Sequence, residues 1–335
     1  MTPIEPYQYT IRNTVSCRGI GLHTGSMVNL TIKPGPANSG IRFVRSDITS
    51  RPDIAANFEQ VVDTQLATTI GEGSTTISTT EHLMAALQGA GIDNALIEVD
   101  SHEVPIMDGS AGPFVHLLKK GGRKQQKALR KIIRITKPIE FVDGDKTIRI
   151  EPYDGFKVTG YIDFDGGIIS KQSYSVDVTS ERFVKEIARA RTFGFVEQVE
   201  HLWANGLALG GTLDNVIAIH WDRRSVLNES GLRFDDEFIR HKVLDLIGDL
   251  ALMGCPVQGH VIANRSGHAL HLGLMKKIVA TPEAWEFVGF KKRGQSIIQQ
   301  TIKNTKKAAK QHFGPLLPKN QSSGPALPPS SPCVA

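Results

Sequence analysis

One polar stripe in an otherwise apolar segment constrains the fold of this chain more than any other feature. Residues 240–250 read RHKVLDLIGDL, which places His241, Asp245 and Asp249 at steps of four. On a helix these three side chains share one face, and the remaining faces are apolar. Polar groups there must be paired or bind an ion, because burying them without partners costs free energy. His241 and Asp245, one turn apart, can bind the same zinc ion; a solvated face with an Asp-His pair explains the spacing equally well.

The composition indicates a globular protein of the reducing cytoplasm. A chain of 335 residues with 40% hydrophobic content can bury a sizeable core, and we expect two. No apolar run approaches the roughly 20 residues that span a bilayer, and the first residues do not resemble a secretory signal. The three cysteines are widely spaced and form no CxxC pair, which argues against a cysteine-built zinc site.

The basic net charge belongs to one end of the chain. Residues 276–319 hold ten Lys/Arg and two Glu, a local charge of +8, so the total of +5 leaves about −3 on residues 1–275. We therefore expect no nucleic-acid partner, because the folded body is mildly acidic.

The order of predicted elements indicates two similar α+β domains. A helix starting after Thr79 or Thr80, a strand at 95–99 and a helix at 111–120 close a first domain, residues 1–123. The polar segment 121–127 is the best linker candidate. The stripe helix, a strand at 260–263 and a helix from residue 268 repeat this order in a second domain, residues 128–295. For 296–335 we expect a basic helix over 296–311 and then disorder.

Glu81 and His82 stand at the predicted start of the first of these helices, and alone they are a weak signal. Combined with His241 and Asp245 they gain weight, because two histidines and a carboxylate leave the fourth zinc position open for water. A neighbouring glutamate is then the natural general base. His268 follows a Ser-Gly turn, where it is either a catalytic loop residue or a polar helix cap.

Thr192 offers a hydroxyl between arginine and phenylalanine in the segment ARTFGF. For its neighbours Phe193 and Phe195, the simpler interpretation is that they are ordinary core residues.

Several motifs, in order and at sensible spacing over about residues 8–275, resemble one enzyme family. They are CRGIGLHTG (17–25), TEHL (80–83), GIDN (91–94), VPIMDGS (104–110), ARTFG (190–194), LGG (209–211), LRF (232–234), the stripe helix and SGHA (266–269). Together they are similar to the zinc-dependent UDP-3-O-acyl-N-acetylglucosamine deacetylase family of lipid A synthesis. One departure is Gly166-Gly167 in place of the usual His-Pro step, which we expect to loosen that loop.

The resemblance implies a role for each matching position. The zinc ligands would be His82, His241 and Asp245, with Fe²⁺ as the alternative metal. Glu81 would be the general base, and His268, supported by Asp249, the general acid. Thr192 and the metal would stabilise the oxyanion.

The same resemblance implies a substrate site and a fold. Lys242 would contact the substrate or its diphosphate, and the site would be lined by Leu22, His23, Phe193 and Gly211. Family members hold the acyl chain in a passage formed by an insert, which would lie at about 193–215 in this chain. The implied fold is α+β, with two similar domains, each a two-layer sandwich of helices on a mixed sheet, and the active site between them.

The function implied is a metal-dependent amidohydrolase that removes the N-acetyl group from UDP-3-O-(3-hydroxyacyl)-N-acetylglucosamine and releases acetate. This is the committed step of lipid A, and hence lipopolysaccharide, biosynthesis in a Gram-negative bacterium. The alternatives are a zinc amidohydrolase of the same fold on another N-acylated substrate, and a catalytically silent binding module. We expect a cytoplasmic monomer with a solvated tail; contact of the basic tail with anionic lipid is the sharper alternative.

Overall fold

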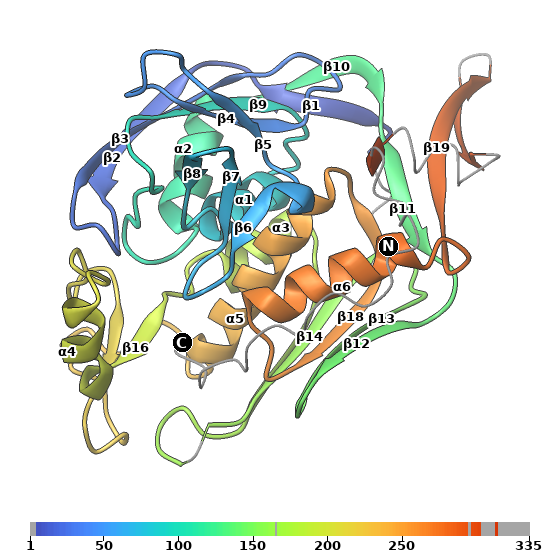
Figure 1. Cartoon of the computed structure of the whole chain (residues 1–335). Helices are drawn as coiled ribbons and strands as arrows, with labels where there is room; N and C mark the ends of the chain where they lie inside the picture. Colours follow the sequence, from blue (N-terminus) through green and yellow to red (C-terminus); the bar gives the residue numbers. More distant parts are fainter. Residues whose placement is uncertain (1–4, 165, 294–295, 303–311, 314–335) are drawn as a thin grey trace.

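The two halves of the chain form two α+β domains whose helices meet in the middle of the molecule (Figure 1). The computed structural model describes residues 5–164, 166–293, 296–302 and 312–313. No helix in this described part has the length and apolar character that crossing a membrane requires.

The first domain is built on a five-stranded mixed sheet in the order β2-β3-β9-β4-β5. Its central strand β9 runs antiparallel to β3 and parallel to β4. Alternate residues of β9 are fully buried, as expected for a strand between a helical layer and solvent. The elements are β2 (Val15–Ile20), β3 (Met27–Pro34), β4 (Ile41–Arg45), β5 (Asp53–Ala55), α1 (Glu81–Gly89), β9 (Ala95–Val99) and α2 (Gly112–Gly121).

The second domain is built on an eight-stranded mixed sheet around β18, which runs antiparallel to β13 and parallel to β11 and β14. Helices α5 and α6 cover one face of this sheet (Figure 1). The elements are β11 (Lys131–Ile135), β12 (Ile139–Asp143), β13 (Lys146–Glu151), β14 (Phe156–Ile162), β15 (Gln172–Asp177), α5 (Glu237–Leu250), β18 (Val257–Asn264), α6 (His268–Ala280), β19 (Trp285–Arg293) and β20 (Ser296–Thr301).

The order α1-β9-α2 in the first domain returns as α5-β18-α6 in the second. In both, the strand after the first helix is central in its sheet, with an antiparallel and a parallel neighbour. The expected fold class, two similar helix-on-sheet sandwiches, is confirmed.

Smaller elements complete the described chain. Strands β1 and β10 pair with each other, as do β16 and β17, while β6, β7 and β8 form a small sheet. Their bounds, with those of the remaining helices, are β1 (Tyr7–Ile11), η1 (Phe58–Gln60), β6 (Val61–Asp63), β7 (Thr69–Glu72), β8 (Thr75–Ile77), β10 (Arg123–Leu129), α3 (Ser180–Arg182), η2 (Phe183–Ile187), β16 (Phe193–Phe195), α4 (Val196–Ala204), β17 (Ile217–Ile219) and η3 (Ala251–Met253).

The predicted linker between the two domains is wrong. Residues 121–127 are not a linker, because α2 continues through Gly121 and β10 pairs with β1. The guanidinium of Arg123 lies 3.8 Å from the ring centroid of Tyr9, which stabilises this polar strand by a cation–π contact that composition does not reveal.

The basic helix predicted over 296–311 is wrong for 296–301, because β20 pairs with β19 and a hairpin overrides the local helix preference. Most of the predicted disordered tail lies outside the described residues. Phe313 is an exception: it is 5% exposed and contacts the rings of Phe58 and Trp285 at centroid distances of 5.8 and 6.0 Å.

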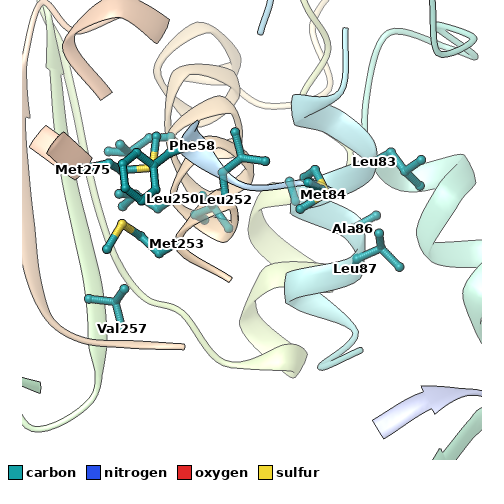
Figure 2. Packing of buried hydrophobic residues seen from close by; sticks show 14 of the residues in the cluster. Phe58, Leu83, Met84, Ala86, Leu87, Leu250, Leu252, Met253, Val257 and Met275 are labelled. Atoms are coloured by element: carbon teal, nitrogen blue, oxygen red, sulfur yellow. The ribbon is translucent and has the colours of Figure 1, made fainter. Parts of the chain in front are cut away.

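The hydrophobic core runs through both domains because α1 packs against α5. Figure 2 shows side chains of α1 and of the end of α5 in this core, including Leu83, Met84, Leu87 and Leu250. The apolar faces of α5 are therefore buried between the two domains, and its polar stripe faces the start of α1.

Candidate metal centre and active site

The polar stripe of α5 is buried, with His241, Asp245 and Asp249 exposed by 2, 3 and 1%. His241 Nε2 lies 3.3 Å from Asp245 Oδ1. The other ring nitrogen, Nδ1, lies 3.1 Å from the carbonyl oxygen of Ala190 and donates to it. That bond leaves the lone pair of His241 Nε2 directed at the carboxylate rather than a proton.

His82, the second residue of α1, brings the third polar group from the first domain. Its Nε2 lies 3.5 Å from the same Asp245 Oδ1, and its ring lies edge-on to that of His241 at a centroid distance of 4.9 Å. One nitrogen or oxygen atom from each of the three residues lies within 4.8 Å of the other two. The three residues predicted as ligands are thus brought together.

The donor set fits a cation. Asp245 Oδ1 is buried and accepts no hydrogen bond, although it faces two imidazole nitrogens. Burial opposes ionisation, yet the neighbouring His241, His82 and Lys242 hold the pKa of Asp245 far below its usual range. A buried carboxylate oxygen without a proton donor is costly unless a cation satisfies it. These side chains can hold a metal ion, and two imidazoles with one carboxylate suit zinc or iron.

Glu81 precedes His82 and lies beside this centre, 4% exposed. Its Oε2 accepts a hydrogen bond from the backbone N–H of Thr68 at 3.1 Å. Burial raises the pKa of Glu81, which makes it a better proton acceptor than a solvated glutamate. The hydroxyl of Thr80, the residue before α1, donates to the carbonyl oxygen of Thr68 and makes no capping bond to the helix.

His268 begins α6 and faces the pocket from the second domain. Its Nδ1 donates to Asp249 Oδ2 at 2.8 Å, and the hydroxyl of Thr68 donates to Asp249 Oδ1 at 2.6 Å. Burial opposes protonation, but the carboxylates of Asp249 and Glu81 raise the pKa of His268 to about 9. The imidazole is therefore cationic at neutral pH and can donate a proton.

Nine of the predicted site residues line one pocket between the domains: Leu22, His23, Glu81, His82, Thr192, His241, Lys242, Asp245 and His268. The enclosed volume is about 20 Å³, enough for one water-sized species, so any larger ligand would lie at its mouth. Asp249 lies behind His268. Phe193 and Gly211 are not among the lining residues, but each lies close to one that is. The ring centroid of Phe193 lies 5.4 Å from Lys242 Nζ, and a Cβ on Gly211 would lie 3.7 Å from Leu22 Cδ1.

The sequence prediction missed several residues of the site. Leu66, Thr79 and Ile106 also line the pocket. Leu66 and Thr79 have φ of +62° and +57°, a strained backbone for these residue types. Neither composition nor spacing signals such loop geometry.

Glu103 was also missed. It is 1% exposed, and its carboxylate accepts from the backbone N–H of His23 at 2.8 Å, from that of Thr24 at 3.0 Å and from the hydroxyl of Thr79 at 3.2 Å. It ties the loop of Leu22 and His23 to the start of α1.

The predicted insert, 193–215, contains β16 and α4, and it contacts the loop after β2. Phe193 and Phe195 are buried in a small core with Phe238, as the simpler interpretation had it. Trp203 and Leu209, by contrast, are 54% and 52% exposed. The loop of Gly166 and Gly167 was expected to be loose, but at Gly167 it packs tightly. A Cβ there would lie 2.0 Å from the carbonyl oxygen of Arg223, so only glycine fits.

Comparison with known proteins identifies the family. Residues 8–280 match the family model of UDP-3-O-acyl N-acetylglycosamine deacetylase. The UDP-3-O-acyl-N-acetylglucosamine deacetylase of Idiomarina loihiensis is 50% identical over 286 residues, 84% of this chain and 93% of that protein. The enzyme of the same name from Acidithiobacillus ferrooxidans is 49% identical over 288 residues, 85% and 94% of the two chains.

The chain belongs to this deacetylase family. As a member it is a hydrolase that acts on an amide, which confirms the resemblance seen in the motifs and the enzyme class. The matched range contains every residue that lines the pocket, and it ends before β19.

Proposed function

We propose that this deacetylase hydrolyses the N-acetyl group of a UDP-linked, 3-O-acylated N-acetylglucosamine, and that zinc held by His82, His241 and Asp245 is its cofactor. The observation that carries the proposal is the orphaned oxygen of Asp245 facing two imidazole nitrogens, next to a buried glutamate. When bound, zinc supplies Lewis-acid activation of a water molecule and of the acetamide carbonyl.

The residues around the ligands divide the proton transfers between them. Glu81, with its raised pKa, removes a proton from the attacking water. Thr192 lines the same pocket, and its hydroxyl is assigned to donate to the oxyanion that develops on the acetamide. His268, charged through its bond to Asp249, delivers a proton to the leaving amine. The products are acetate and the free amine.

Substrate binding is assigned to the mouth of the pocket. Lys242 Nζ lies 3.9 Å from Asp245 Oδ2 and 5.4 Å from the ring of Phe193, so its charge stands at the edge of the metal centre. A cation there suits the diphosphate of a UDP-sugar. The exposed apolar side chains of the insert, such as Trp203 and Leu209, supply a surface for the acyl chain.

The test is a deacetylation assay with the metal-loaded protein and synthetic UDP-3-O-acyl-N-acetylglucosamine, following acetate release. Activity should disappear with a chelator and return with zinc; return with iron alone would assign the metal differently. No acetate from this substrate, with metal fully bound, would favour another N-acylated substrate. No metal bound at all would favour a silent binding module.

The proposal includes a cytoplasmic enzyme that acts as a monomer. Sedimentation of the purified protein tests whether it is a monomer.

Contact of the basic C-terminal segment with anionic lipid is tested by liposome binding with and without residues 300–335. Unchanged binding after the deletion would remove that part of the proposal.

A further inference from the structure

His271 is a buried histidine that the mechanism above does not use. It is one turn after His268 on α6 and 1% exposed. Its Nδ1 lies 2.7 Å from Asp249 Oδ2, the same oxygen that accepts from His268. Its Nε2 lies 3.1 Å from the hydroxyl of the half-buried Ser266. Both ring nitrogens therefore have partners among the described residues.

The carboxylate of Asp249 joins these contacts into one network. Oδ1 accepts from the hydroxyl of Thr68, and Oδ2 accepts from two imidazoles. An ionised carboxylate can accept all three hydrogen bonds, whereas a protonated one would lose an acceptor site. Burial opposes ionisation, but His268 and His271 lower the pKa of Asp249 to about 2. The network thus requires a proton on Nδ1 of both histidines.

The two histidines differ in what their second nitrogen does. His268 lines the pocket, and its Nε2 is the nitrogen left for a substrate. Burial lowers the pKa of His271, so this ring is neutral and its Nε2 accepts from Ser266. Charged groups with an influence on the pair are Glu81 on α1 and Asp245 and Asp249 on α5.

We propose that His271 is a positioning residue for the general acid: as a neutral Nδ1–H donor it fixes the Asp249 carboxylate and divides its negative charge between two imidazoles. This inference rests on the proposed function, because it assigns the supporting group of the same proton donor. The ionised carboxylate of Asp249 can only accept, so it fixes the proton of His271 on Nδ1, and the hydroxyl of Ser266 is free to donate to Nε2. Asp249 transmits the effect, and His268 carries it to the substrate. A ring that only filled space would need neither polar partner.

The main test is His271→Phe in the zinc-loaded enzyme, with His271→Asn as the matched variant whose amide still donates. In His271→Phe, kcat should fall about five- to tenfold, less than the roughly 100-fold loss of a missing general acid, with KM and zinc content unchanged. The alkaline limb of the pH–kcat profile should move to higher pH, because all of the Asp249 charge then acts on His268. His271→Asn should restore both kcat and the limb.

A wild-type profile and kcat in folded His271→Phe would overturn the inference while leaving the proposed function intact. Failure of the unsubstituted enzyme to release acetate would instead overturn the proposed function.

A second measurement does not depend on activity or on a variant that folds. Long-range ¹H–¹⁵N NMR of the unsubstituted zinc-loaded protein should show His271 neutral, with its proton on Nδ1, between pH 7 and 9. A proton on Nε2 alone, or a cationic ring over this range, would overturn the inference.

Discussion

Gly248 of α5 lies directly against the backbone of Glu81 at the start of α1. A Cβ on Gly248 would lie 2.0 Å from the carbonyl oxygen of Glu81, far inside van der Waals contact. Gly248 stands between Asp245 and Asp249 on α5, so the two helices are in direct contact beside the proposed metal centre. This contact explains how His82 comes to within 3.5 Å of Asp245 across the domain boundary.

Substituting Gly248 tests whether this close approach assembles the metal centre. In Gly248→Ala the helices must separate, so the free energy of unfolding should fall by about 3 kcal/mol, at the upper end for overpacking, and zinc affinity should drop. Gly194→Ala is the control, because a Cβ there meets no atom within 4 Å. Urea unfolding and zinc titration measure both. Equal zinc affinity in the two variants would show that the close contact at Gly248 does not assemble the metal centre.

Substitutions of the adjacent residues Glu81 and His82 should remove different properties of the enzyme. His82→Ala removes a ligand, so the purified protein should lack stoichiometric metal. Glu81→Gln keeps the size of the side chain but cannot take a proton, so it should retain metal and lose activity about 100-fold or more. Elemental analysis and acetate release distinguish the two. Near-normal turnover and metal content in both variants would refute the assigned roles.

The alkaline limb of the pH–rate profile should depend on Asp249. A proton donor works below its pKa, and the pKa of His268 is raised to about 9, so activity should be present at neutral pH and fall as pH rises through the pKa of His268. In Asp249→Asn the negative charge is gone, the pKa of His268 falls, and the limb should move to lower pH by at least about one unit. Asp53→Asn, in an exposed ion pair with Arg42, is the control and should keep the wild-type limb.

The ion pair of Arg191 and Glu237 should be worth far more than surface pairs. Both side chains are buried, at 4% and 0% exposure, with Arg191 Nε 2.9 Å from Glu237 Oε1. Their pairing holds the segment before Thr192 against the start of α5. In Glu237→Gln an uncompensated buried charge remains, so the free energy of unfolding should fall by about 3 kcal/mol. Asp145→Asn, at a 64% exposed carboxylate that pairs with the 44% exposed Arg265, should cost under about 1 kcal/mol.

Phe313 should stabilise the contact of the two domains. Its ring meets Phe58 of the first domain and Trp285 of the second, in a site 5% exposed. Phe313→Ala should lower the free energy of unfolding by about 3 kcal/mol, the usual loss for a buried phenylalanine. Trp203→Ala, at a 54% exposed position, should change it little. Melting curves of the two variants compare them, and equal losses would contradict the assignment.

Elements with a strong local pattern were predictable. The strand at 95–99 has the predicted bounds, because every second residue of this segment is apolar and buried. The strands β10 and β20 were not, since each is polar and exists through a partner strand far away or through a hairpin. Strand formation in such segments depends on pairing, which the local sequence does not encode.

Asp249 and His271 illustrate how far the site could be predicted from the sequence. Spacing places Asp249 on the stripe, but only the fold turns it toward α6, where two imidazoles and Thr68 occupy its oxygens. His271 stands two residues after the SGHA motif (266–269), and no pattern in the sequence marks it as part of the site. No sequence pattern pointed to loop residues such as Thr68 and Glu103, because their contacts join residues that are tens of positions or more apart in the chain.

The sequence by itself determined the polar stripe, the adjacent Glu81 and His82, and the family, because these depend on residue types at short spacing. A helix repeats every 3.6 residues wherever it lies, so the stripe needs no tertiary knowledge. Residue spacing alone left open which stripe residues act together, and only the resemblance named His82 as their partner. The contact itself is made by the packing of α1 on α5. That crossing depends on a missing Cβ at Gly248 and on a core shared by both domains, which are properties of the folded chain.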